Sequence, residues 1–154
     1  MPQFSTARHV PHSATDMFDL VADVESYPRF VPLCESLVVR SRREDGPREI
    51  LIATMGIAYK LIRESFTTRV VLDREAMTIR AEYLDGPFSH LENVWRFEPH
   101  GRGDCIVHFD IDYAFRSRAL SMLMGAVFDR AFRKFTQAFE ERADAVYGAP
   151  AARA

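Results

Sequence analysis

One long amphipathic helix, predicted over residues 117–147, constrains the fold of this chain more than any other feature. Apolar residues recur there at steps of three and four, which places them on one helical face. The face consists of Phe128, Phe132, Phe135, Phe139, Ala143 and Val146, widened by Leu120, Met124, Val127, Ala131 and Ala138. A helix of this length spans roughly 40 Å. The rest of the chain must therefore supply a large apolar partner.

Two interpretations of this apolar face remain open at the level of sequence. The simpler one is an amphipathic helix packed into an ordinary core. The other is that the same face also forms one wall of a cavity for an apolar ligand. Periodicity alone predicts burial and does not distinguish between the two.

Composition predicts one ordinary globular domain. The chain has 154 residues, of which 47% are hydrophobic and 27% charged, enough for one substantial core. We predict a single domain over residues 1–147 and a disordered tail over residues 148–154. The net charge of −2 does not favour a nucleic-acid partner, so we expect no DNA binding.

The cysteines and the apolar runs indicate the cellular compartment of the protein. Cys34 and Cys105 lie far apart and match no metal or redox spacing, so we expect two free thiols in a reducing environment. No basic segment followed by an apolar run opens the chain, and we expect no secretory signal. The longest nearly apolar run, residues 119–128, is too short to span a bilayer. We expect a bacterial cytoplasmic protein, with peripheral contact to the inner membrane left open.

The segments before the helix alternate in polarity as strands do. A first strand is predicted over residues 3–11, followed by a helix with Ser13 as its N-cap and a stiff connector over residues 27–34, with room for one helical turn between Pro28 and Pro32. Six further strands are predicted to begin at Leu37, Ile50, Tyr59, Met77, Leu91 and Cys105. Turns are expected at residues 46–47, Gly56, 85–87 and 100–104.

This order of elements predicts an α+β fold. Short connections make neighbouring strands antiparallel, and each strand is apolar on one side only. We therefore predict a bent antiparallel sheet that closes its apolar face around the C-terminal helix, with short helices after the first strand.

Catalytic motifs are absent from the sequence. It contains no nucleophile elbow, no phosphate-binding glycine loop and no His-Glu-x-x-His segment. The five histidines are scattered, and we interpret them as solvated side chains rather than metal ligands. Asp110 and Asp112 share the polar face of a strand, where a general acid–base pair would lack the dry environment it needs. We predict no catalytic and no metal-binding residues.

Three polar-tipped side chains are nevertheless predicted to point inward. Asn93 lies two positions from both Leu91 and Trp95, so its side chain faces the same side of the strand as theirs. A buried amide needs a hydrogen-bond partner. That partner is either nearby backbone or a carbonyl group of a ligand. Trp95 and Tyr113 also combine an apolar body with one polar group. Glu64 and Thr68 raise the same question less clearly.

Several segments, in order along residues 4–147, resemble the coenzyme Q-binding protein and ribosome-association-toxin family of the START-like, polyketide cyclase/dehydrase superfamily. The segments are Met17-Phe18-Asp19-Leu20-Val21-Ala22-Asp23-Val24, Tyr27-Pro28-x-Phe30-x-Pro32-x-Cys34, Glu64-Ser65-Phe66-Thr67-Thr68-Arg69-Val70, Asp85-Gly86-Pro87-Phe88, Leu91-Glu92-Asn93-x-Trp95-Arg96-Phe97 and Phe139-Glu140-x-Arg142-Ala143.

The resemblance implies a helix-grip fold, with a seven-stranded antiparallel sheet around the C-terminal helix. It further implies a non-enzymatic protein that carries ubiquinone or a related polyprenyl lipid in an apolar tunnel and supports respiratory electron transfer. No cofactor is expected besides ubiquinone as a bound ligand. Candidate tunnel mouths are the connector 27–34 and the Gly56 turn. The expected ligand contacts are Phe30, Tyr59, Phe66, Leu91, Asn93, Trp95, Tyr113, Met124, Phe128, Phe132 and Phe135.

The resemblance leaves a second function open, a toxin that binds the large ribosomal subunit and blocks subunit association. The low net charge counts slightly against it, because ribosome binders often carry a basic face. A local basic face is available from Arg116, Arg118, Arg130, Arg133 and Lys134. A third class, a cyclase or hydrolase, would need a buried ionisable pair that the sequence does not reveal.

Overall fold

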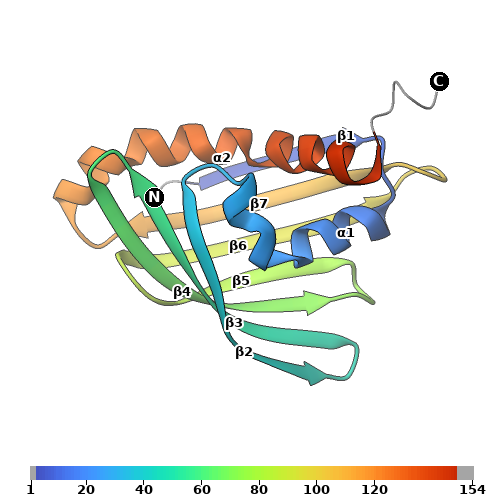
Figure 1. Ribbon diagram of the computed structural model, residues 1–154, viewed down its shortest axis with the longest axis horizontal. Helices are drawn as coiled ribbons and strands as arrows, with labels where there is room; N and C mark the ends of the chain where they lie inside the picture. Colours follow the sequence, from blue (N-terminus) through green and yellow to red (C-terminus); the bar gives the residue numbers. More distant parts are fainter. Residues whose placement is uncertain (1–2, 149–154) are drawn as a thin grey trace.

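The computed structural model describes residues 3–148 and has one seven-stranded antiparallel sheet with a long helix across one face (Figure 1). The strands lie in the order β1-β7-β6-β5-β4-β3-β2, so the first strand joins the sheet beside the last. They are β1 (Gln3–Val10), β2 (Cys34–Asp45), β3 (Arg48–Tyr59), β4 (Ile62–Asp73), β5 (Thr78–Asp85), β6 (Phe88–Pro99) and β7 (Cys105–Phe115). The helices are α1 (Ala14–Ala22), the 3₁₀ helix η1 (Val24–Arg29) and α2 (Arg118–Tyr147).

The long helix α2 begins and ends where the sequence predicts. The hydroxyl of Ser117 accepts a hydrogen bond from the Leu120 amide at 3.2 Å, which caps the first turn. Gly148, with φ of +102°, follows the last turn, and its amide donates to the Asp144 carbonyl. The predicted tail beyond Gly148 lies outside the described residues. The capped helix therefore spans the sheet as a single element.

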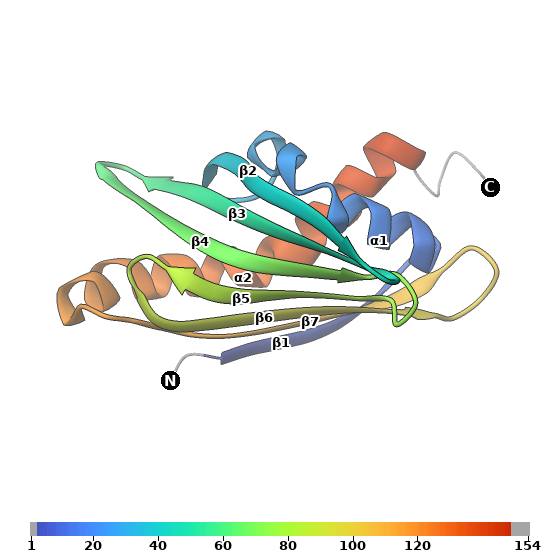
Figure 2. The ribbon, with the colours of Figure 1, turned by 90° about the horizontal axis from the view of Figure 1, so that it is seen from below.

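The concave face of the sheet holds the apolar side of α2. Phe128, Phe132 and Phe139 are all buried, as are Met124 and Ala143. The view turned by 90° shows the strands crossing in front of α2 (Figure 2). One end of the predicted stripe does not pack, because Val146 remains 50% exposed on the last turn. The predicted α+β architecture is otherwise the observed one.

The prediction of a turn at Gly56 was wrong. Gly56 lies inside β3, paired with Ser65 of β4, and the chain turns four residues later, at Lys60 and Leu61. A Cβ atom at Gly56 would lie 2.3 Å from the Ser36 hydroxyl oxygen of β2. The glycine leaves room for the Ser36 hydroxyl, beside a register shift in β2 between Cys34 and Ser36, whereas the Cβ atom of Ser36 would lie at 3.6 Å. Gly56 therefore pairs within the sheet and does not form a turn.

Two other predicted boundaries also moved. The strand predicted to begin at Leu37 is β2, which begins at Cys34 and continues to Asp45, so the predicted turn takes only residues 46–47. The helical turn expected between the two prolines forms earlier, as η1, and contains Pro28. A 3₁₀ helix this short tolerates proline near its end. Ser13 caps α1 as predicted, accepting from the Asp16 amide at 3.1 Å.

Replacement of Phe139 by alanine is expected to be among the most destabilising changes in α2. Its ring is 1% exposed and lies 4.9 Å from the Trp95 ring and 5.0 Å from the Phe30 ring. Truncation should lower the free energy of unfolding by about 3–5 kcal/mol, measured by urea denaturation. Val146→Ala on the exposed end should change it by less than about 0.5 kcal/mol. Equal effects of the two changes would contradict this account of α2 packing.

Candidate functional site: an apolar cavity under the long helix

A cavity of about 110 Å³ lies between the concave face of the sheet and the apolar face of α2. Seven of the predicted ligand contacts line it, drawn from strands β4 and β6 and from α2. They are Phe66, Leu91, Asn93, Trp95, Phe128, Phe132 and Phe135. The phenylalanine stripe of α2 is therefore at once part of the core and a cavity wall.

The cavity exists because small side chains face it from three elements. Ala53 lies on β3, Ala81 on β5 and Ala131 on α2, and all three line the space. Side chains with one methyl group cannot reach the aromatic rings of the opposite wall. The hollow thus follows from where the sequence places alanine among larger residues.

Two polar side chains interrupt the apolar wall, and each has an alanine as its neighbour on an adjacent strand. Asn93 pairs with Ala81, and Thr68 pairs with Ala53. The Asn93 amide nitrogen donates to the Asp110 carbonyl at 2.9 Å, which fixes the orientation of the side chain. An amide nitrogen carries two N–H groups. Asn93 therefore has a backbone partner and also lines the cavity, so the two alternatives for it do not exclude each other.

Four predicted contacts lie outside the cavity wall. Met124 is buried in the core near the start of α2, and Tyr59 lies at the end of β3 beneath the Lys60 ammonium group. Phe30 packs on the Phe139 ring. Tyr113 lies among aromatic rings, 5.2 Å from that of Phe132. Tertiary packing determines these positions, and the inward direction of a side chain alone does not predict them.

The environment of Tyr113 also differs from that of a ligand-facing hydroxyl. Burial raises the pKa of Tyr113, and the Asp129 carboxylate adds a smaller effect in the same direction. Because Asp129 belongs to α2 and is exposed, the Tyr113 hydroxyl is influenced by a group outside the cavity wall. Of the polar side chains proposed from sequence, Asn93, Thr68 and the Trp95 indole are on the wall, and Glu64 and Tyr113 are not.

Most of the aliphatic wall was not predicted from the sequence. The wall residues not named as such are Val24, Leu37, Ala53, Met55, Ile57, Val70, Ile79, Ala81 and Ile111, whereas Ala131 was predicted on the apolar face of the helix. The alternation of side chains between the two faces of a strand identifies these positions. The buried β3 residues Ala53 and Ile57 are separated by an even number of positions, as are Val70 and Leu72 of β4. The same alternation predicts the inward direction of aliphatic residues as well as that of aromatic and polar ones.

The cavity reaches solvent near η1 and the first strands of the curved sheet. Lining residues there are only half-buried, namely Tyr27, Pro32, Leu33, Leu37, Met55, Phe66 and Phe135. On β5–β7, Leu91, Trp95, Ile79 and Ile111 are buried, whereas Ala81 and Asn93 are half-buried. The predicted connector 27–34 thus supplies part of the rim, through Tyr27, Pro32 and Leu33.

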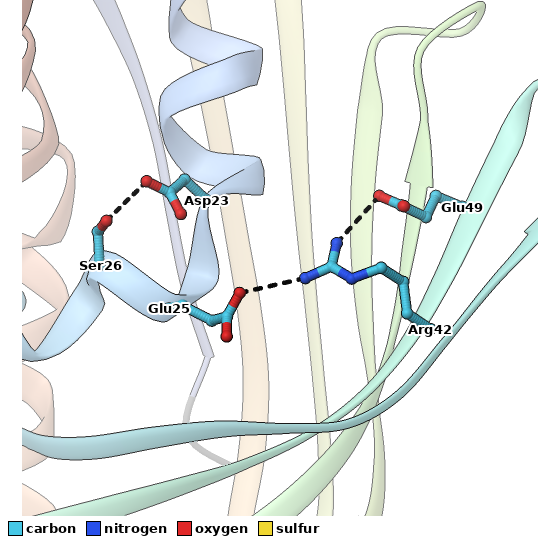
Figure 3. Close-up of polar contacts among 5 residues, drawn as sticks. All are labelled: Asp23, Glu25, Ser26, Arg42 and Glu49. Carbon is cyan, nitrogen blue, oxygen red and sulfur yellow. Dashed lines mark hydrogen bonds and ion pairs between the residues drawn. The ribbon is translucent and has the colours of Figure 1, made fainter.

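A small polar cluster ties η1 to the edge of the sheet (Figure 3). The Arg42 guanidinium of β2 contacts the Glu25 carboxylate of η1 at 3.3 Å and the Glu49 carboxylate of β3 at 3.4 Å. Within η1, the Ser26 hydroxyl donates to Asp23 at 2.6 Å. The Arg42 side chain is 45% exposed, and exposed ion pairs contribute about 0–1 kcal/mol. These ion pairs therefore add little to the stability of the contact between η1 and the sheet.

Chemically, the wall offers apolar surface and a few hydrogen-bonding groups. Among the described residues, no histidine, cysteine, lysine, arginine or carboxylate lines the cavity. The Tyr27 hydroxyl donates to the Val21 carbonyl, and burial, with smaller effects of Cys34 and Asp23, raises the pKa of Tyr27 far above its ordinary value. The arrangement suits an apolar molecule with a hydrogen-bond acceptor. No helix among the described residues has the length and apolarity to cross a membrane.

Known proteins resemble this chain along nearly its whole length. The Ribosome association toxin RatA of Escherichia coli is 35% identical over 97% of this chain and 91% of its own. Coenzyme Q-binding protein COQ10 homolog B, mitochondrial, from Xenopus laevis is 32% identical over 95% of this chain and 59% of its own. The solution structure of an 18 kDa protein from Caulobacter crescentus is 36% identical, with a TM-score of 0.79, over 97% of this chain and all of that one.

The family described as polyketide cyclase/dehydrase and lipid transport matches residues 10–140. That range contains the cavity walls and most of α2. The match and the solved structure confirm the START-like helix-grip fold expected from the sequence. The chain belongs to the polyketide cyclase/dehydrase and lipid transport family, alongside relatives named as ribosome association toxins and coenzyme Q-binding proteins.

Proposed function

We propose that this protein binds and delivers ubiquinone or a related polyprenyl lipid without catalysing a reaction on it. The observation that carries the proposal is an apolar cavity with one amide fixed on its wall, at Asn93. A quinone ring presents carbonyl acceptors, which suit the remaining N–H of such an amide. A relative of 32% identity is named as a coenzyme Q-binding protein, which supports the same ligand class.

The size of the cavity limits how much of the lipid enters. A buried cavity of about 150 Å³ lined by Leu, Ile and Phe is known to hold benzene, and the cavity here measures about 110 Å³. One ring or a short piece of prenyl chain is the amount that fits without rearrangement. The remainder of a long tail then has to leave through the rim formed by Tyr27, Leu33 and Phe135.

Filling the cavity should abolish lipid binding while preserving the fold. Ala81→Phe places a ring in the space between Asn93 and Val70, its partners on the neighbouring strands. We expect at least tenfold less quinone in solvent extracts of the purified protein, measured by mass spectrometry, and no binding of added ubiquinone. Ala7→Phe, on the exposed part of β1, is the matched control and should retain the lipid. Extracts of the native protein without quinone, together with no binding of added ubiquinone, would refute the proposal.

We further propose that the protein acts in the bacterial cytoplasm and touches the inner membrane at one end. Both ribbon views place the β3–β4 turn, the β5–β6 turn and the start of α2 at the same end (Figure 1). Those segments carry exposed apolar side chains, with Leu61 98%, Met122 86%, Leu123 63% and Leu84 50% exposed. Lys60, Arg116 and Arg118 flank them, alongside the acidic Glu64 and Asp85. Bacterial relatives support this placement.

Removal of these apolar side chains should weaken membrane contact. The triple change Leu61→Ser, Met122→Ser and Leu123→Ser deletes side chains that each contribute up to about 1.5–3 kcal/mol when buried in an apolar phase. We expect at least tenfold weaker co-sedimentation with vesicles of phosphatidylglycerol and phosphatidylethanolamine. Val38→Ser with Val146→Ser, at 47% and 50% exposed positions, serves as control. Equal loss in both variants would contradict a docking end.

A second candidate function, binding to the large ribosomal subunit, is favoured by the outer face of α2. Arg118, Arg130, Arg133 and Lys134 are exposed along that face, although Arg133 pairs with Asp129 at 3.0 Å. A basic stripe on a long helix suits a phosphate backbone. Relatives of 35% identity from Escherichia coli and Shigella flexneri are named as ribosome association toxins.

Charge reversal on α2 distinguishes this candidate from lipid binding. Arg130→Glu with Lys134→Glu should reduce co-sedimentation with large subunits at least tenfold at low salt, and raised salt should weaken the wild-type interaction. Arg43→Glu with Arg48→Glu, near the β2–β3 turn, makes the same charge change elsewhere. Absence of wild-type co-sedimentation at low salt would exclude ribosome binding and leave the lipid proposal untouched.

A further inference from the structure

Two histidines distant in sequence meet at one end of the molecule. His9 is the penultimate residue of β1, and His100 opens the turn between β6 and β7. Their ring centroids are 4.8 Å apart. Local sequence patterns do not associate them, because two helices and strands β2–β6 lie between β1 and this turn along the chain. Antiparallel pairing of β1 with β7, in which His9 faces Ile106, brings them together.

Asp104 completes the group from the far side of the same turn. Its carboxylate oxygen Oδ2 accepts hydrogen bonds from His9 Nε2 and from His100 Nδ1, the second at 2.9 Å. The backbone of the turn is closed by the His100 amide, which donates to the Asp104 carbonyl at 3.2 Å. A Cβ atom at Gly101 would lie 2.3 Å from Asp104 Oδ1. The turn therefore has a glycine where the carboxylate needs space.

Other histidine–carboxylate pairs in the chain have only two members. His90 lies 3.1 Å from Asp112, His108 2.8 Å from Glu98 and His12 2.7 Å from Asp144. Among residues 3–148, only His9, His100 and Asp104 bring three ligand atoms within 4.8 Å of one another. This difference separates a potential metal site from the paired histidines, of which His90 and His108 lie on the sheet and His12 is buried between β1 and α1.

We propose that His9, His100 and Asp104 form a zinc-binding site, with water completing the coordination. Two imidazoles and one carboxylate are typical zinc ligands, at distances of about 2.0–2.2 Å. Tetrahedral geometry then needs ligand atoms roughly 3.4 Å apart, so these side chains must shift by about 1 Å or less. The histidine side chains are 58% and 55% exposed and that of Asp104 is 25% exposed, which leaves them free to adjust.

Zinc binding would replace the two hydrogen bonds to Asp104, in which His9 Nε2 and His100 Nδ1 carry the protons. Metal ligation requires the proton of each neutral imidazole to sit on the other ring nitrogen, His9 Nδ1 and His100 Nε2. Because both rings are more than half exposed, water can hydrogen-bond those nitrogens.

A bound ion would fasten an edge strand of the sheet. Strand β1 pairs only with β7, and the His9–Asp104 contact joins residues 95 positions apart. The site lies at the end of the molecule opposite the start of α2 (Figure 1). It is therefore separate from the cavity, and the inference does not depend on the proposed lipid function.

Metal titration of untagged protein tests the site directly. Zn²⁺ should bind saturably with one ion per chain in calorimetry, raise the melting temperature and slow amide hydrogen exchange in β1, all reversed by EDTA. Co²⁺ should give the visible absorption bands of a low-symmetry four-coordinate site. Asp104→Asn and His100→Ala should each weaken Zn²⁺ binding at least tenfold.

The His108→Ala variant is the matched control, because it removes a histidine from a two-member pair on the same sheet. It should bind Zn²⁺ as the wild type does. Circular dichroism of all variants checks that the fold is retained. Absence of saturable Zn²⁺ binding by the wild type, or equal binding by Asp104→Asn and His108→Ala, would overturn the proposal and leave a hydrogen-bonded His–Asp–His cluster.

Discussion

Aromatic packing between α2 and the sheet is the interaction on which the rest of the structure depends. Near the end of the helix, Phe139 contacts Trp95, Tyr27 and Phe30, with centroids 4.9–5.3 Å apart. Nearer its start, Phe128 contacts rings that include Phe115, Phe88 and Tyr113. The helix is thus fixed at two points along its length. Between them, Phe132 and Phe135 span the hollow part of the sheet.

The cavity is maintained at a cost in stability. Empty space in a protein interior costs about 24 cal/mol per Å³, so a cavity of about 110 Å³ corresponds to about 2–3 kcal/mol. Larger side chains at Ala53, Ala81 or Ala131 would recover part of that energy. A sequence selected for stability alone would fill the space. The combination of three alanines with an oriented amide, at Asn93, is better explained by a ligand than by imperfect packing.

Elements with strong periodicity were predicted correctly from the sequence, and the errors concern residues whose positions depend on contacts between elements. Helix α2 and strand β7 were predicted to within one residue because their apolar positions repeat without interruption. Gly56 was wrongly predicted to form a turn, because its contact with Ser36 of the neighbouring strand is not visible in the local sequence. Tyr113 was assigned to the cavity by parity, yet surrounding aromatic rings keep it away. The cluster of His9, His100 and Asp104 requires the pairing of β1 with β7, which local sequence patterns do not contain.

The two candidate functions of α2 use opposite faces of one helix and therefore do not exclude each other sterically. Burial of Phe128 and Phe132 forces Arg130 and Lys134 outward, because residues two positions apart lie on different sides of a helix. The apolar face thus determines where the basic face points. Aromatic contacts at two points hold α2 against the sheet. A ligand under Phe132 and Phe135 would therefore move side chains at the rim before it moved the whole helix. Occupancy of the cavity and presentation of the basic face are then largely independent, and any coupling between them has to pass through Phe135 and the half-buried rim.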